Sequence, residues 1–202
     1  MASIESILFA AGIDSIAGVD EAGRGACAGP LVVAAVILKY PVSTRLGDLQ
    51  DSKALSEIAR EKFFKVILEE AIAISIIEVS SSEIDERGVH AANIDGMRRA
   101  VLGLQKVPDY VLTDGYPISG LGIPSLGVWK GDQLVETISA ASIIAKVTRD
   151  RIMAKFDDIY LGYGFASHKG YSTSSHLEAV KMLGALDIHR RSFANIATLI
   201  NK

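Results

Sequence analysis

Short apolar runs rich in β-branched residues alternate along the chain with longer stretches of helical spacing. The predicted strands are Ser15–Val19, Leu31–Leu38, Ala73–Val79, Tyr110–Thr113 and Ser125–Trp129. The predicted helices are Ser56–Ala71, His90–Leu104, Gln133–Phe156, Thr173–Leu183 and Phe193–Ile200. Two strands come first as a hairpin-like pair, strands and helices then alternate, and the end is helical. This order predicts an α/β fold in which a mixed sheet is flanked by helices.

The predicted helix Gln133–Phe156 is apolar around most of its circumference. A helix of this kind is usually buried among other elements rather than lying on the surface. We therefore expect it to pack centrally against the sheet. Gly162 and Gly164 mark the end of this helical stretch and open a loop.

The composition of the 202 residues is that of an ordinary globular protein. The one cysteine, Cys27, excludes an intramolecular disulfide and fits a reducing compartment. No apolar run approaches about 18 residues, so no membrane span is expected. The N-terminus has no basic segment and carries Glu5, which argues against a signal peptide. A cytoplasmic protein is the simplest interpretation.

The net charge of −3 hides an uneven distribution. Residues 1–139 contain 12 Lys and Arg against 19 Asp and Glu, whereas residues 140–202 contain 9 against 5 and three of the four histidines. An acidic body with a basic C-terminal third is compatible with a metal centre beside a phosphate-binding face. The same asymmetry also arises by chance in proteins that bind no nucleic acid.

Acidic residues follow apolar segments at three separate places. Asp20 and Glu21 end the first predicted strand before a Gly-Arg-Gly turn, and Asp114 ends the fourth. Asp132 stands at the start of the long apolar helix. Each has an ordinary alternative: an Arg24–Glu21 ion pair, an Asp-Gly turn and a helix N-cap. A regular strand also points Asp20 and Glu21 to opposite faces, so a shared site requires the strand to end or bulge there.

If the three segments meet, their four carboxylates form an all-oxygen centre that suits Mg²⁺ or Mn²⁺. Two such ions can activate water and stabilise the leaving oxygen in phosphodiester cleavage. Lysines and arginines beside small hydroxyl residues, in segments 51–53, 146–151 and 168–173, fit a phosphate path. They fit a solvated surface equally well. Spacing alone leaves open whether these segments come together.

The order of several motifs resembles the ribonuclease HII family, the bacterial type 2 ribonucleases H, over nearly the whole chain. The shared motifs are GVDEAGRG at 18–25, AGP at 28–30, DSK at 51–53, NI at 93–94, TDG at 113–115, GD at 131–132, AASIIAKVTRD at 140–150, HKGYST at 168–173, His176 and HRRSF at 189–193. Each motif is weak by itself, but their joint presence in this order is highly specific.

The resemblance implies one ribonuclease H-like catalytic domain over residues 1–202. It has a core at about 15–160 and a helical, substrate-binding C-terminal region at about 161–202. It implies that Asp20, Glu21, Asp114 and Asp132 are catalytic and bind Mn²⁺ or Mg²⁺, as two ions. The expected reaction is hydrolysis of the RNA strand of RNA–DNA hybrids and nicking of duplex DNA 5′ of embedded ribonucleotides, leaving 3′-hydroxyl and 5′-phosphate ends.

The resemblance also implies contacts to the nucleic acid. The loop Gly23, Arg24 and Gly25 faces the 2′-hydroxyl, which distinguishes RNA from DNA. Tyr171 packs on the deoxyribose after the ribonucleotide. The residues expected to support the backbone or the site are Ser52, Lys53, Lys146 and Arg149. The chain departs from the common pattern at Ala26-Cys27, at Leu161 and at Ser172, and none of these positions is an expected metal ligand.

Three alternatives differ in specific features. A ribonuclease HIII-like enzyme usually has an extra N-terminal domain and a lysine where this chain has Arg24. Another two-metal nuclease on the same core would lack the HKGY segment and the GRG turn. A non-catalytic hybrid-binding module would have lost a carboxylate, whereas all four are present. The last residues, 198–202, form no clear clamp-docking peptide, and a monomer is expected.

Overall fold

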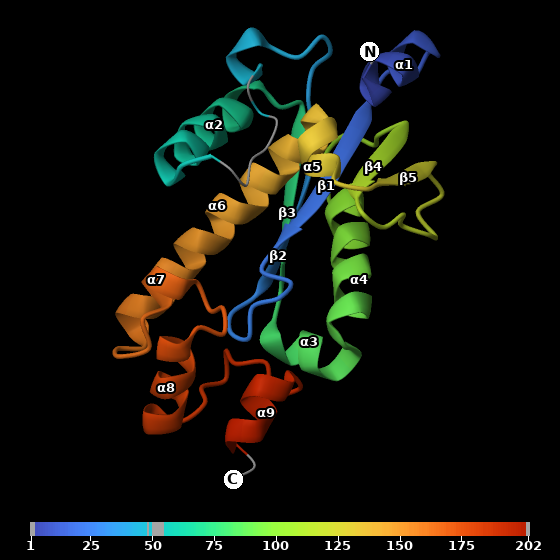
Figure 1. Ribbon diagram of the computed structural model, residues 1–202. Coiled ribbons are helices and arrows are strands. Elements are labelled where there is room, and N and C mark those ends of the chain that lie inside the picture. Colours follow the sequence, from blue (N-terminus) through green and yellow to red (C-terminus); the bar gives the residue numbers. More distant parts are fainter. Residues whose placement is uncertain (1–2, 48, 50–54, 201–202) are drawn as a thin grey trace.

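A five-stranded mixed sheet forms the centre of the computed structural model, which describes residues 3–47, 49 and 55–200 (Figure 1). The strands are β1 Ile16–Ala22, β2 Leu31–Ile37, β3 Ala73–Val79, β4 Tyr110–Asp114 and β5 Ser125–Val128. Their spatial order is β3-β2-β1-β4-β5. Pairing is antiparallel from β3 to β1 and parallel from β1 to β5. The predicted mixed sheet and its hairpin-like first pair are confirmed.

Helices cover both faces of this sheet. Their bounds are α1 Ile4–Ala10, the 3₁₀ turn η1 Thr44–Leu46, α2 Glu57–Glu70, α3 Ser81–Arg87, α4 Val89–Leu102, α5 Gly131–Leu134, α6 Glu136–Ile159, α7 Phe165–His168, α8 Ser174–Leu183 and α9 Ala194–Ile200. One apolar core lies between the sheet and α4, and a second lies between the sheet, α2 and α6. The helices α8 and α9 lie at the opposite end of the molecule from the N-terminus (Figure 1).

The long helix α6 packs centrally, as its apolar circumference predicted. It crosses β1 so closely that a Cβ atom at Gly18 would lie 2.1 Å from the backbone carbonyl carbon of Thr137. Glycine therefore allows the helix and strand backbones to touch. This close approach brings the polar residues of α6 to the end of β1.

The prediction of one helix over Gln133–Phe156 is wrong at its start. The structure has α5 and α6 separated by Val135, whose backbone is extended. The backbone amides of Glu136 and Thr137 donate to the carboxylate of Glu5, at 2.9 and 3.0 Å. Glu5 thus accepts hydrogen bonds from the otherwise unpaired backbone amides in the first turn of α6. It lies 131 residues before Glu136 in the sequence, so no local pattern reveals this contact.

Four short elements were not predicted: α1, η1, α3 and α7. Each spans seven residues or fewer, which is too short to show a helical period. Serine caps nonetheless mark three of them, since Ser3 accepts from the Ser6 amide, Ser43 from the Arg45 amide and Ser80 from the Glu83 amide. In the described part of the chain, none of the helices has both the length and the apolarity to cross a bilayer.

Candidate active site

Acidic residues from three segments meet at one edge of the sheet. Parallel pairing aligns Val19 of β1 with Thr113 of β4, so that Asp20 and Asp114 follow on adjacent strands, about 4.8 Å apart in backbone spacing. The Gly131 amide donates to Asp114 Oδ1 at 2.8 Å. That bond draws the first turn of α5, including the buried Asp132, to the same edge. The tertiary fold therefore joins segments whose meeting the spacing left open.

The environment of Asp20 strongly perturbs its carboxyl group. Burial raises its pKa well above the ordinary value, and the negative charges of Glu21 and Asp114 raise it further. Its Oδ1 accepts from the Glu21 amide at 2.7 Å. Its Oδ2 is buried and makes no hydrogen bond of normal geometry to the described residues, and a side-chain interaction with Ser142 of α6 lowers the pKa of Asp20. A carboxylate in this state is poised to accept a cation.

Glu21 lies at the rim of the group. β1 stays in register with β2 through Ala22, so the strand is not bulged and backbone alternation separates Glu21 from Asp20. Arg24 Nη1 lies 3.9 Å from Glu21 Oε1, so the local ion pair considered from the sequence is present, at a length where its contribution is small. The Arg24–Glu21 ion pair is therefore present together with the acidic edge, and one does not exclude the other.

Asp132 is not the N-cap that its position suggested. It lies inside the first turn of α5, and the cap position is held by Lys130, whose backbone is left-handed with φ 54°. Asp114 takes over the capping by accepting from Gly131. Asp132 is only 2% exposed. The Asp-Gly turn after β4 is also present, with Gly115 at φ 78°.

The donor set of this edge fits a hard divalent cation, because it consists of carboxylate oxygens that repel one another. Within residues 3–47, 49 and 55–200, no three acidic, imidazole or thiol groups converge tightly enough to be a ready-made ion site. The carboxylates are thus neighbours rather than a preformed cage. The orphaned Asp20 Oδ2 and the neighbours that raise the Asp20 pKa are the observations that favour cation binding here.

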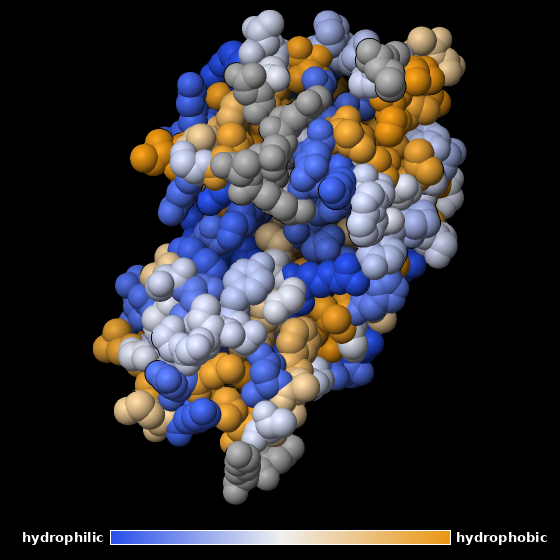
Figure 2. Space-filling view, in the orientation of Figure 1, coloured by the Kyte–Doolittle hydropathy of each residue, from blue (hydrophilic) through white to orange (hydrophobic). Residues whose placement is uncertain are grey.

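A cavity of about 310 Å³ adjoins the acidic edge. Its lining consists of Glu21, Ala22, Gly23, Arg24, Gly25, Arg60, Ser142, Lys146 and Tyr171. It therefore unites the Gly-Arg-Gly loop with the expected tyrosine and one expected lysine, while Asp20, Asp114 and Asp132 lie outside the lining. Figure 2 shows hydrophilic side chains gathered across the middle of this face of the molecule.

Three lining residues, Ala22, Arg60 and Ser142, were not among the predicted site residues. Ser142 lies four positions before Lys146 on α6, so helical spacing from Lys146 could have identified it. Arg60 comes from α2, and only the packing of α2 against α6 brings it there. Lys146 itself donates to Asp150 Oδ1 at 2.8 Å. The expected residues Ser52 and Lys53 lie outside the described part of the chain.

The loop that carries Tyr171 is held by hydrogen bonds along its backbone. Gly170 O accepts from the amides of Cys27 and Ala28, at 2.9 and 3.2 Å. Its amide donates to His168 Nδ1 at 3.1 Å, and Tyr171 O lies 2.9 Å from His176 Nδ1. The ring of Tyr171 remains 41% exposed. A fixed backbone with an exposed ring is suited to stacking on a ligand.

His176 and His189 form a buried relay beneath this loop. His189 Nδ1 accepts from the Leu186 amide, so its other nitrogen carries the proton and donates to His176 Nε2 at 3.1 Å. His176 Nδ1 then donates to Tyr171 O. Burial, followed by repulsion from His176, lowers the pKa of His189 to about 4. Both rings are therefore neutral at pH 7, and the relay is satisfied.

Arg149 does not line the cavity, although it was expected to support the substrate. It is 1% exposed, and its guanidinium donates to three backbone carbonyls behind the cavity. Burial lowers the pKa of Arg149. The structure thus places Arg149 behind the loops rather than in front of them.

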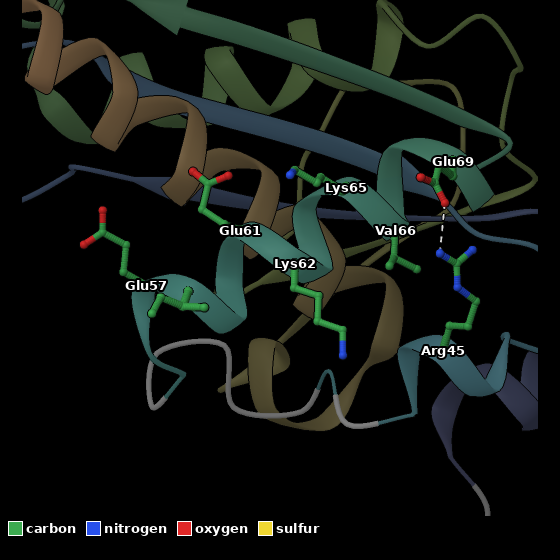
Figure 3. Close-up of a pocket in the computed structure, with 8 residues that line it drawn as sticks. Arg45, Glu57, Glu61, Lys62, Lys65, Val66 and Glu69 are labelled. Carbon is green, nitrogen blue, oxygen red and sulfur yellow. Dashed lines mark hydrogen bonds and ion pairs between the residues drawn. The ribbon is translucent and has the colours of Figure 1, made fainter.

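A hollow of about 700 Å³, larger than the cavity beside the acidic edge, lies elsewhere, over α2 (Figure 3). Acidic and basic side chains alternate along it, and Arg45 pairs with Glu69 at 2.9 Å. None of the four expected carboxylates lines it. Its balanced charge and open shape fit a solvated helix surface better than a catalytic site.

Comparison with known proteins identifies a nuclease family, which agrees with an acidic edge beside a cavity. Residues 17–196 match the family model described as Ribonuclease HII. A ribonuclease HII of Rhodococcus opacus (strain B4) is 52% identical over 200 residues, covering 99% of this chain and 88% of that protein.

Two solved structures share the fold. The ribonuclease H2 crystal structure from Pyrococcus horikoshii OT3 has a TM-score of 0.80 at 30% identity, covering 93% of this chain and 97% of that one. The structure of a PCNA:RNase HII complex from Archaeoglobus fulgidus gives 0.76 at 26% identity over 93% and 97%. The chain therefore belongs to the ribonuclease HII family, endoribonucleases that cleave RNA in RNA–DNA hybrids and cut 5′ of ribonucleotides embedded in DNA.

Proposed function

We propose that Asp20, Glu21, Asp114 and Asp132 hold two divalent ions, Mn²⁺ or Mg²⁺, against the phosphate 5′ of a ribonucleotide. The observation that carries this assignment is the meeting of β1, β4 and α5 at one acidic edge beside the cavity. Bound ions would supply an activated water and stabilise charge on the leaving oxygen. Cleavage leaves a 3′-hydroxyl and a 5′-phosphate.

The protein's own groups divide the remaining work. Buried Asp20 supplies an oxygen with no hydrogen-bond partner of normal geometry in the described structure, so little protein bonding must be broken to bind a cation. Gly23, Arg24 and Gly25 border the cavity where a ribose would lie, and their backbone can approach its 2′-hydroxyl closely. Tyr171 offers its exposed ring to the sugar of the next nucleotide. Lys146, which must release Asp150 to do so, contacts a phosphate.

Residues beyond the cavity complete the assignment. Ser52 and Lys53 support the nucleic-acid backbone, and the region from about 161 to 202 acts as the substrate-binding part of a single catalytic domain. Its fixed tyrosine loop supports this role. The substrates are RNA–DNA hybrids and DNA duplexes containing ribonucleotides. The enzyme acts on them as a monomer in the cytoplasm. A clamp contact like that in the PCNA:RNase HII complex of the Archaeoglobus protein is possible, but residues 198–202 form no clear docking peptide to support it.

The alternatives differ in how well they fit. Membership in the ribonuclease HII family removes the ribonuclease HIII-like alternative and that of an unrelated two-metal nuclease. A non-catalytic binding module requires the loss of a carboxylate, and all four remain in place.

The test is cleavage of a labelled DNA duplex that contains one ribonucleotide, with Mg²⁺, Mn²⁺ or EDTA. We expect a metal-dependent nick on the 5′ side of the ribonucleotide. Cutting confined to long RNA–DNA hybrids would keep the nuclease and remove the roles given to Arg24 and Tyr171. Folded protein that cuts neither substrate would restore the binding module.

A further inference from the structure

Arg190, in the loop before α9, is completely buried although it is charged. Its Nη1 donates to the carbonyl of Arg24 at 2.9 Å. Its Nη2 and Nε donate to the carbonyl of Gly29, at 3.1 and 3.3 Å. The Arg190 amide also donates to Cys27 O at 2.8 Å. Arg190, near the C-terminus, is therefore hydrogen-bonded to the segment from Arg24 to Gly29, which begins in the Gly-Arg-Gly loop.

The bonding of Arg190 is unusual for a buried charge. Among the residues that the structure describes, no carboxylate lies within ion-pair distance of its guanidinium. Burial, followed by repulsion from Arg149, lowers its pKa to about 10, so it stays charged at neutral pH. Burying a charge without a counter-ion is costly unless strong hydrogen bonds replace the lost water. Here the carbonyls of the loop supply them, and the charge in turn fixes the direction of these carbonyls.

Arg149 of α6 reaches the same segment from the other side. It donates to Ala28 O at 3.1 Å and to Pro30 O at 2.9 Å, and its third bond goes to Lys169 O of the tyrosine loop at 2.8 Å. Its guanidinium carbon lies 5.6 Å from the centre of the Tyr171 ring. One guanidinium thus touches both substrate-facing loops.

Gly23 shows how closely Arg149 packs against the first of these loops. A Cβ atom at Gly23 would lie 1.8 Å from Arg149 Nε, and the backbone there has φ 88°. Glycine is therefore required on two independent grounds, conformation and space. The first glycine of the Gly-Arg-Gly turn accommodates the buried arginine, in addition to any closeness to substrate.

We propose that Arg190 and Arg149 form a two-arginine clamp that fixes the Gly-Arg-Gly loop relative to the tyrosine loop. In this clamp Arg190 is a positioning residue for ribonucleotide selectivity. The inference rests on the proposed function, which assigns the 2′-hydroxyl to the first loop and the following sugar to the second. Recognition of an RNA-to-DNA junction requires both loops at a fixed separation. Misplacement by about 1 Å in such a site can cost about 100-fold in rate.

The experiment compares Arg190→Lys with Arg191→Lys, its neighbour in the sequence. Arg191 is the matched control because its side chain is 55% exposed and pairs only distantly with Asp187, at 3.6 Å. The lysine at 190 keeps the charge but cannot span the carbonyls of Arg24 and Gly29 together. For each variant, kcat and KM are measured on a duplex with one ribonucleotide and on a long RNA–DNA hybrid, and the melting temperature is recorded.

For Arg190→Lys we expect kcat on the single-ribonucleotide duplex to fall by about 10- to 100-fold, with KM little changed. The loss on the long hybrid should be smaller, because a hybrid offers many ribonucleotides in many registers. Arg191→Lys should match the wild type on both substrates. Equal losses on the two substrates, or unchanged kinetics with a lower melting temperature, would reduce Arg190 to a structural residue and overturn the inference.

A double-mutant cycle with Tyr171→Ala keeps the idea testable if the single variant is weakly stable. If the clamp couples the two loops, the effects of Arg190→Lys and Tyr171→Ala on the ratio of the two substrates are not additive. Additive effects would overturn the coupling. Failure of the proposed function is distinguishable, because the wild type and Arg191→Lys would then also show no cut at a single ribonucleotide.

Discussion

The acidic edge and the loop cluster behind the cavity handle buried polar groups in opposite ways. At the acidic edge, burial raises the pKa of Asp20, and the like charges of Glu21 and Asp114 beside it raise this pKa further. In the loop cluster, Arg149 and Arg190 are surrounded by carbonyls that accept their hydrogen bonds. The acidic edge therefore keeps repulsion between like charges, whereas backbone carbonyls already accept the hydrogen bonds of the two buried guanidinium groups.

This difference separates the chemistry of the molecule from its stability. If the carboxylates bind the cation as proposed, neutralising one of them removes a ligand and also relieves repulsion, so activity and stability should change in opposite directions. Disturbing the satisfied loop cluster leaves buried donors or acceptors without partners, so stability and selectivity should fall together. Four substitutions test this contrast, from the largest expected effect to the smallest.

Asp20→Asn should slow cleavage at least about 1000-fold, which at about 1.4 kcal/mol per tenfold is some 4 kcal/mol. Binding of the hybrid should be largely spared. The melting temperature in EDTA should rise, by about 2–4 °C for each kcal/mol of repulsion relieved. Single-turnover kinetics and calorimetry measure the two effects, with the fully exposed Asp187→Asn as a control that changes neither. Near-normal turnover of Asp20→Asn would remove the catalytic assignment.

Tyr171→Ala should reduce cleavage at a single embedded ribonucleotide by about 10- to 100-fold, the range expected for loss of one stacking contact worth about 1–3 kcal/mol. Cleavage of a long hybrid should fall less. Because the ring is 41% exposed, the melting temperature should change little. Tyr171→Phe, which keeps the ring, is the matched control. Equal losses on both substrates would show that Tyr171 does not sense the junction.

The histidine relay predicts a loss of stability in mild acid. His189 has a pKa of about 4 when folded and about 6.5 when unfolded, so between these values the unfolded chain binds a proton that the folded chain does not. The stabilisation is complete above about pH 6.5. The free energy of unfolding then falls as pH drops toward 4, by up to about 1.4 kcal/mol per pH unit.

Urea unfolding between pH 7 and pH 4.5 measures this dependence. His189→Asn should flatten it by about one proton, whatever its effect on stability at pH 7. His90→Asn, at an exposed position, is the control for replacing a histidine as such. An unaltered slope in His189→Asn would mean that another group controls the acid response.

Lys146→Ala should have the smallest effect, a few-fold weaker binding of either substrate. Loss of one phosphate contact should reduce the slope of log K against log salt by about 0.9. The effect stays small because Lys146 already forms an ion pair with Asp150, at 2.8 Å, which weakens its attraction for a phosphate. Lys155→Ala, an exposed lysine on the same helix, is the control. An unchanged salt slope would place Lys146 off the phosphate path.

Local pattern predicted much of the fold and the chemical character of the site. Runs of β-branched residues marked all five strands within a few residues, and apolar periodicity found the major helices. The break before α6 was missed because its cap, Glu5, comes from α1. The N-cap alternative for Asp132 failed for a related reason, since Asp114 of β4 accepts the hydrogen bond from the first turn of α5.

The sequence by itself determined which groups the protein has: four carboxylates at the ends of apolar segments, a Gly-Arg-Gly turn and a tyrosine after a lysine and a glycine. It also determined the family, through the order of these motifs. Only the tertiary structure decided which groups are neighbours and which are buried. It brought Asp20 beside Asp114, and it buried Arg149 and Arg190 behind the loops they hold. The physical reason is that strand register and burial arise from pairing and packing between distant segments, which the local spacing of residues does not encode.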